Sequence, residues 1–152
     1  MATRSLVQFF RALSEEPRLR AVMLLLHGEL CVCDLMVILG EPQSKISRHL
    51  AYLKHTGIVS SRRVGLWMYY SLQEPMEETY RVQLRLLKEK FSSRPPFQSD
   101  AEKMLALKAQ GTCKARTVGR PAVRPRSRLS GKKKPSFSER RPGKKDRLLQ
   151  PS

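Results

Sequence analysis

The sequence predicts a mainly α-helical fold that carries one β-hairpin and ends in a basic tail. Three observations lead to this fold class. Apolar residues recur at helical spacing in six segments before residue 110. Two β-rich runs, 58–63 and 66–72, flank Val64-Gly65 and indicate a hairpin. From Gly111 onward no apolar period survives and Pro and Gly are frequent, so we expect residues 111–152 to be disordered.

Each predicted helix is marked by an apolar stripe and by boundary residues. Leu6, Phe9, Phe10 and Leu13 follow the spacing i, i+3, i+4, i+7. Proline suits the first turn of the second helix, and glycine suits its C-terminal cap. The predicted helices are Ser5–Leu13, Pro17–His27, Cys31–Leu39, Gln43–His55 and Pro75–Phe91, with a further short one over 100–108.

The charge is unevenly distributed. The 152 residues carry a formal net charge of +17. Residues 1–110 hold 16 basic and 11 acidic side chains, whereas residues 111–152 hold 14 basic and 2 acidic ones. Lys and Arg displace the counterions condensed on nucleic acid, so a polyanion is the first expected partner. An anionic membrane surface is the alternative.

Cysteine usage and the N-terminal sequence predict a cytoplasmic protein. The chain has three cysteines, Cys31, Cys33 and Cys113, which make a poor disulfide framework. The N-terminal segment lacks the apolar core of a signal peptide, and the longest apolar run, 21–26, is too short to span a bilayer. We expect one domain over 1–92, a short helix or linker over 93–110, and a tail over 111–152.

The segments 31–39 and 43–55 form the centre of the chain's organisation. Gly40-Glu41-Pro42 separates them, and the second has apolar residues on one face and polar, basic residues on the other. A short helix, a tight turn and a helix with a free polar face make a helix-turn-helix. With the hairpin as a wing, the sequence predicts a winged helix-turn-helix.

Three short sequence segments resemble those of a known family. ELCVCDL at 29–35, KISRHLAYL at 45–53 and RRVGLWMYYSL at 62–72 resemble the ArsR/SmtB winged helix-turn-helix repressors, in particular their arsenic-responsive branch. The likeness covers about residues 4–92. It implies a homodimer that binds double-stranded operator DNA, blocks transcription, needs no cofactor, is not an enzyme, and releases DNA when an inducer binds. The first helix and 75–91 would form the dimer interface.

The resemblance also implies which residues meet DNA. The helix Gln43–His55 would enter the major groove, and the wing would contact the backbone or minor groove. Arg48 could form bidentate hydrogen bonds with a guanine edge, or it could bind a phosphate. The expected DNA-binding residues are Gln43, Ser44, Lys45, Ser47, Arg48, His49, Arg62 and Arg63.

Cys31 and Cys33 match the first two of three cysteines that bind trivalent arsenic or antimony in that branch. Met36 occupies the third position, and a thioether is a poorer donor than a thiolate. Water, an external thiol or Cys113 could complete the site. Residues i and i+2 point about 200° apart on a straight helix, so we expect one ion to bind both sulfurs only by unwinding the start of the helix.

Other interpretations of the two thiols remain open. They could be buried apolar side chains, a redox pair, or ligands for cadmium or lead. Residues 1–30 contain no cysteine and residues 75–92 contain no histidine, which disfavours the family's other metal sites. A further alternative is a constitutive or architectural DNA-binding protein that binds nucleic acid through its basic tail and has no inducer. A dithiol oxidoreductase is disfavoured, because the thiols lack a CxxC spacing and a βαβ pattern.

Overall fold

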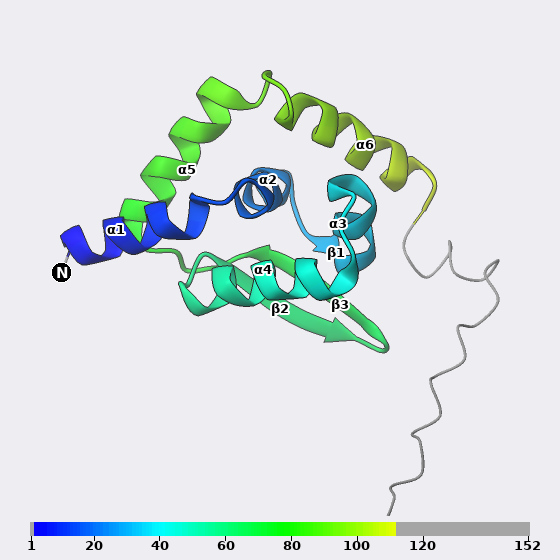
Figure 1. Cartoon of the computed structure of the whole chain (residues 1–152), viewed down its shortest axis with the longest axis horizontal. Coiled ribbons are helices and arrows are strands. Elements are labelled where there is room, and N and C mark those ends of the chain that lie inside the picture. The colour runs from blue at the N-terminus through cyan, green and yellow to red at the C-terminus, as the bar shows by residue number, and fades with distance from the viewer. Residues whose placement is uncertain (1, 112–152) are drawn as a thin grey trace, which may run out of the picture. The chain divides into compact units, whose positions relative to one another are not determined.

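The computed structural model describes residues 2–111, so Cys113 and the tail predicted from Gly111 onward lie outside the described residues except for Gly111 itself. The described elements form one unit (Figure 1). In chain order they are α1 (Ala2–Leu13), α2 (Glu16–Leu25), β1 (Leu30–Cys31), α3 (Val32–Leu39), α4 (Gln43–His55), β2 (Val59–Val64), β3 (Trp67–Leu72), α5 (Glu78–Phe91) and α6 (Phe97–Ala109).

The core joins the helix-turn-helix to the rest of the unit. Gly40 ends α3 in the left-handed conformation, with φ of 69°, and its N–H bonds to the carbonyl of Met36. Glycine reaches this conformation without steric cost, so α3 can stop abruptly before α4. The large side chains that are fully buried come from both helices and from their neighbours: Phe9, Leu24, Leu35, Ile38, Ile46, Leu50, Leu53 and Ile58.

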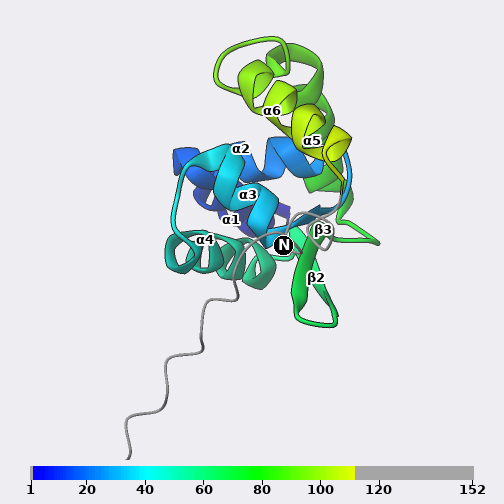
Figure 2. The ribbon, with the colours of Figure 1, turned by 90° about the vertical axis from the view of Figure 1, so that its right-hand side faces the viewer.

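The hairpin projects beside α4 as the predicted wing (Figure 2). Strands β2 and β3 pair antiparallel from Val59↔Leu72 to Val64↔Trp67. The connecting residues are therefore Gly65 and Leu66, one position later than predicted. Gly65 has φ of 61°, which fits a two-residue hairpin turn with glycine first. The mainly α fold with a winged helix-turn-helix is confirmed.

Several predicted boundaries were wrong. α1 begins at Ala2 rather than Ser5, and α2 spans Glu16–Leu25 rather than Pro17–His27. α5 begins at Glu78 rather than Pro75, because the chain bends at Glu74 and Pro75 after β3 and Glu77, with ψ of 133°, is not yet helical. Residue 31 is not helical: β1 pairs with β3 at Leu30↔Tyr70 and Cys31↔Tyr69, giving the sheet order β1-β3-β2. A two-residue strand has no periodicity of its own and exists only through its distant partner.

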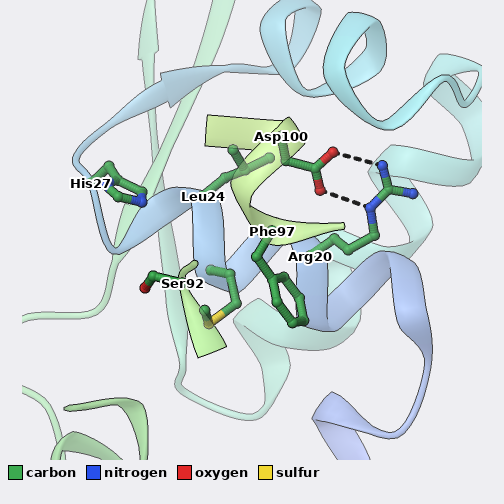
Figure 3. A pocket seen from close by; sticks show the side chains of 7 residues that line it. Arg20, Leu24, His27, Ser92, Phe97 and Asp100 are labelled. Carbon is green, nitrogen blue, oxygen red and sulfur yellow. Dashed lines mark hydrogen bonds and ion pairs between the residues drawn. The ribbon is translucent and has the colours of Figure 1, made fainter. Parts of the chain in front are cut away.

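The helix predicted over 100–108 is longer than expected and docks against α2 and α3. Asp100 on α6 is 1 % exposed and accepts hydrogen bonds from Nε and Nη2 of Arg20 on α2, both 2.8 Å long (Figure 3). Met104, one turn later, is also buried. Across residues 2–111, none of the helices has both the length and the apolar character required to span a membrane.

Candidate nucleic-acid interface and thiol site

Helix α4 presents a polar surface opposite its buried face. Ile46, Leu50 and Leu53 are buried at helical spacing and anchor the helix in the core. Of the six α4 residues expected to meet DNA, four are exposed and two, Ser47 and His49, are half-buried. The exposed residues are Gln43, Ser44, Lys45 and Arg48.

Of the six α4 side chains expected to meet DNA, those of Lys45 and His49 lie close to carboxylates of the protein. Lys45 Nζ lies 3.2 Å from a carboxylate oxygen of Glu41, but its side chain remains 58 % exposed. His49 Nδ1 lies 3.5 Å from a carboxylate oxygen of Glu15, and its side chain is only 18 % exposed. His49 is therefore directed toward the start of α2 rather than outward, whereas Lys45 and Arg48 stay on the surface.

The two wing arginines are both exposed but differ in their protein contacts. Arg62 donates two hydrogen bonds to the Glu29 carboxylate, Nε to Oε2 at 2.6 Å and Nη2 to Oε1. Its guanidinium also lies 5.3 Å from the centroid of the Tyr69 ring. Hydrogen bonding to Arg62 lowers the pKa of Glu29 below its ordinary value. Arg63 is exposed at the other face of the strand, so it is the freer cation of the pair.

The two thiols converge where β1 meets α3. Cys31 has φ of −74° and ψ of 150° and serves as the N-cap of α3, while Cys33 lies in the first turn. Their Sγ atoms are 3.2 Å apart. The expectation that the sulfurs diverge by about 200° was wrong, because that angle applies only when both residues are helical. The extended backbone at Cys31 turns its side chain toward Cys33, so the helix need not unwind to bring them together.

A cavity of about 140 Å³ opens beside Cys31. Cys31 itself is 1 % exposed, and Cys33 is half-buried. Met36 is half-buried and packs against the core. The cavity is lined by Glu29, Leu30, Cys31, Asp34, Tyr69, Lys108 and Gly111. Within residues 2–111, no cluster of three or more His, Cys, Asp or Glu side chains has the arrangement of a metal site.

Sequence reasoning missed the residues that position these two surfaces. Arg18 is buried, donates to the carbonyls of Ala12 and Arg11, and lies 4.3 Å from the centroid of the Tyr52 ring on α4. It therefore joins α1, α2 and α4. An arginine beside the helix-start proline gave no sequence signal of this role, because its partners lie on other elements.

The comparisons with known proteins identify relatives of this chain. Residues 15–61 match the family model described as "Bacterial regulatory protein, arsR family". The chain is 53% identical over 64 residues to the arsenic resistance transcriptional regulator ArsR2 of Pseudomonas putida, covering 41% of this chain and 56% of that one. It is 49% identical over 67 residues to the arsenical resistance operon repressor of Escherichia coli, covering 43% and 57%. The chain thus spans rather more than half the length of these relatives.

Further relatives include a regulator of cadmium resistance and proteins of known structure. A cadmium resistance regulatory protein CadC homolog of Staphylococcus aureus is 44% identical over 66 residues, covering 43% of this chain and 54% of that one. The transcriptional regulator HlyU of Vibrio vulnificus matches with a TM-score of 0.50 and 32% identity, covering 56% of this chain and 85% of that one. A homodimeric winged helix-turn-helix domain of Mycobacterium bovis matches with a TM-score of 0.50 and 26% identity, covering 57% and 78%. By their names these relatives are regulators rather than enzymes.

Proposed function

The chain belongs to the arsR family of bacterial regulatory proteins, and from this premise we propose that it is a metalloid-responsive transcriptional repressor. In this proposal a dimer binds operator DNA in the cytoplasm through α4 and the wing. Trivalent arsenic or antimony then binds Cys31 and Cys33 and the dimer releases the DNA. No cofactor is required.

One observation carries this proposal: the thiol pair adjoins both DNA-reading elements. Cys31 lies in β1, which pairs with the wing strand β3 at Tyr69. Cys33 lies in the first turn of α3, which packs against α4. A ligand held by both sulfurs therefore acts at the junction of wing and recognition helix.

The separation of the sulfurs suits a pyramidal ion. With a metal–thiolate bond of about 2.3 Å, sulfurs 3.2 Å apart subtend about 90° at a shared ion. A trivalent ion with a lone pair holds its ligands in a pyramid with angles close to this value. A tetrahedral ion with the same bond length requires sulfurs about 3.8 Å apart. The pair is thus closer to the geometry of arsenic and antimony than to that of a four-coordinate divalent metal.

Release follows from a difference in affinity between two shapes of the protein. An inducer shifts the equilibrium only by as much as it binds the released shape more tightly. Replacing the 3.2 Å sulfur contact by two bonds to an ion constrains Cys31 and Cys33 relative to each other. Because they belong to different elements, that constraint couples β1 to α3, and through them the wing to α4.

A dimer is part of the proposal because α1 and α5 expose apolar side chains. Phe9 on α1 and Tyr80 on α5 stack with ring centroids 5.0 Å apart, which ties the two helices together. Apolar side chains exposed on α1 and α5 are suited to pack against a second copy of the chain. They are Val7 and Phe10 on α1, and Val82, Leu86 and Phe91 on α5, each 39 % to 54 % exposed.

The experiment is a titration of the operator complex with arsenite. Fluorescence anisotropy of DNA from the gene's own upstream region is followed under reducing conditions. The parent should bind and then release DNA, whereas Cys31→Ser/Cys33→Ser should bind and ignore arsenite. Val37→Ser is the matched control, since Val37 is an exposed residue of α3 and its replacement leaves both thiols intact. Tight binding by the parent that ignores arsenite refutes the proposed inducer.

A second candidate is a repressor of this family that responds to cadmium, lead or oxidants. The likeness to the cadmium regulator favours the metals, and two sulfurs 3.2 Å apart also favour oxidation to a disulfide. The same titration with Cd²⁺, Pb²⁺ and hydrogen peroxide distinguishes these inducers. Release by one of them in place of arsenite would select it, and release by none would indicate a constitutive repressor.

A further inference from the structure

A second cavity, separate from the one beside Cys31, opens where the end of α2, the end of β3 and α5 meet. Its volume is about 200 Å³, and its apolar lining consists of Leu26, Leu72, Met76 and Leu84. Leu26 is the C-cap of α2, Leu72 is the last residue of β3, and Leu84 lies in the middle of α5. A water molecule needs only about 10–15 Å³ measured in this way, so the cavity has room for a molecule of several carbon atoms.

Three basic side chains of α5 border this cavity. Arg81, Arg85 and Lys88 are spaced i, i+4, i+7, so they project from one face of the helix, and all three line the cavity. Arg81 already has partners within the protein. It donates a hydrogen bond of 3.0 Å to the carbonyl of Met76, and its Nη1 lies 3.2 Å from a carboxylate oxygen of Glu78.

Arg85 and Lys88 lack such partners. Both are exposed, and neither forms an ion pair with another residue of the described range 2–111. The lining contains one carboxylate, that of Glu74, against three cations. Neighbouring like charges at i, i+3 and i, i+4 repel each other on a helix. The cavity therefore combines an apolar lining with positive charge that the described residues do not neutralise.

This combination determines which chemical class of ligand the cavity suits. A guanidinium and an ammonium group donate strong hydrogen bonds to a carboxylate. The apolar lining gains from contact with hydrocarbon, because that contact removes apolar surface from water. An inorganic anion would leave the lining exposed to water, and a neutral apolar molecule would leave the cations without a partner.

From these observations we propose that the cavity binds a small organic carboxylate with an apolar body. The carboxylate accepts hydrogen bonds from Arg85 and Lys88. The apolar body covers Leu26 and Leu72. This site is independent of the proposed inducer, since none of its lining residues borders the cavity beside Cys31. Because Leu72 ends the wing strand β3, the bound anion would connect the base of the wing to α5.

The cavity and the surface proposed for a second copy of the chain use different faces of α5. Val82 and Leu86 are exposed apolar residues of α5, and each follows an arginine of the cavity by one position. One position along an α-helix is a rotation of about 100°. A second copy packed on Val82 and Leu86 therefore need not cover Arg81 and Arg85.

The experiment compares three ligands on the reduced full-length protein by isothermal titration calorimetry. Octanoate has a carboxylate and an apolar chain, acetate has the carboxylate alone, and 1-octanol has the chain alone. Octanoate should bind at least about tenfold more tightly than either, because each part of it contributes to binding. Octanoate should also shift the methyl NMR signals of Leu26, Leu72 and Met76 but not that of Val37 on α3. Equal affinity for 1-octanol, or shifts confined to other methyl groups, would overturn the proposal.

A pair of variants tests the two cations. Arg85→Gln/Lys88→Gln should weaken octanoate binding by about tenfold or more and leave the binding of 1-octanol unchanged, which also shows that the cavity is intact. Lys90→Gln/Lys103→Gln is the matched control, because it removes the same charge from exposed positions of α5 and α6 that do not line the cavity. The control should bind octanoate as the parent does. Equal losses in both variants would assign the binding to the general positive charge of the chain and refute the site.

Discussion

The ion pair between Arg20 and Asp100 should determine whether α6 stays docked, and Asp100→Asn tests it. The Arg20 side chain is 17 % exposed and that of Asp100 is 2 % exposed, so both charges are largely removed from water. Hydrogen bonding to Asp100 raises the pKa of Arg20 above its ordinary value. Arg20 cannot lose its proton, so the substitution leaves a buried cation whose remaining acidic neighbours are the exposed Glu16, 3.6 Å away, and Glu41.

The expected loss follows from the bonds removed. Two hydrogen bonds between charged groups contribute about 1.5–3 kcal/mol each, and an asparagine oxygen can replace one of them by a weaker bond from the still charged guanidinium, of about 1.5 kcal/mol. Breaking a buried pair typically costs about 3–5 kcal/mol. Because Arg20 retains some solvent and Glu16, we expect about 2–3 kcal/mol. That loss should fall on α6 first, because the Asp100 carboxylate holds the first turns of α6 on α2.

Hydrogen exchange followed by mass spectrometry measures the loss of stability in each helix separately. Amides of residues 97–109 should exchange about 30- to 150-fold faster in Asp100→Asn, since each 1.4 kcal/mol corresponds to a factor of ten. Amides of α4 should be unaffected. The double variant Arg20→Met/Asp100→Leu should recover most of the protection, because apolar residues of similar size can replace a buried pair. Unchanged exchange in Asp100→Asn would refute the role given to the ion pair.

Three further predictions concern the DNA-reading surface. Arg48→Ala should weaken operator binding by about 1–3 kcal/mol. His49→Ala should weaken it much less, because the His49 side chain is turned inward. Equal losses of affinity for the two variants, measured by fluorescence anisotropy, would contradict this orientation. Arg63→Ala should reduce the slope of log affinity against log salt by about one, and an unchanged slope would exclude a phosphate contact. The Glu29–Arg62 pair stabilises the fold above the ordinary carboxylate pKa of 4.5 and loses this effect as pH falls below it. The urea midpoints of the parent and Glu29→Gln should therefore converge in acid.

Local patterns predicted the elements that are stabilised by their own apolar faces. The stripe of Ile46, Leu50 and Leu53 predicted α4 with its bounds, and all three residues are buried. The stripe of Tyr80 and Leu84 predicted α5, although its first turn was misplaced. Helices of three or more turns repeat their pattern often enough to be recognised. β1 could not be predicted, since two residues have no pattern and the partner strand lies about 40 positions away.

The candidate site was predictable in its residue types but not in its geometry. The spacing of Cys31 and Cys33 indicated a thiol pair, yet the assumption of a continuous helix gave divergent sulfurs where the structure has a 3.2 Å contact. Glu29 carried no sequence signal as a partner of Arg62, because 33 residues separate them. In both cases the pairing of strands that are distant in the sequence brings the side chains together. Local patterns in a single sequence do not show which distant strands pair.

If an inducer binds the thiol pair as proposed, the strand at Cys31 also determines how large an effect on DNA affinity the fold can support. A 100-fold loss of operator affinity corresponds to a coupling free energy of about 2.7 kcal/mol. The two residue pairs between β1 and β3 contribute about 1–3 kcal/mol if each involves one backbone hydrogen bond. Straining that short ladder is therefore of the right magnitude by itself, and the adjoining Glu29–Arg62 pair can add to it. Had Cys31 belonged to α3, a ligand bound as proposed would act on one helix alone, and the wing would have no direct share in the proposed release.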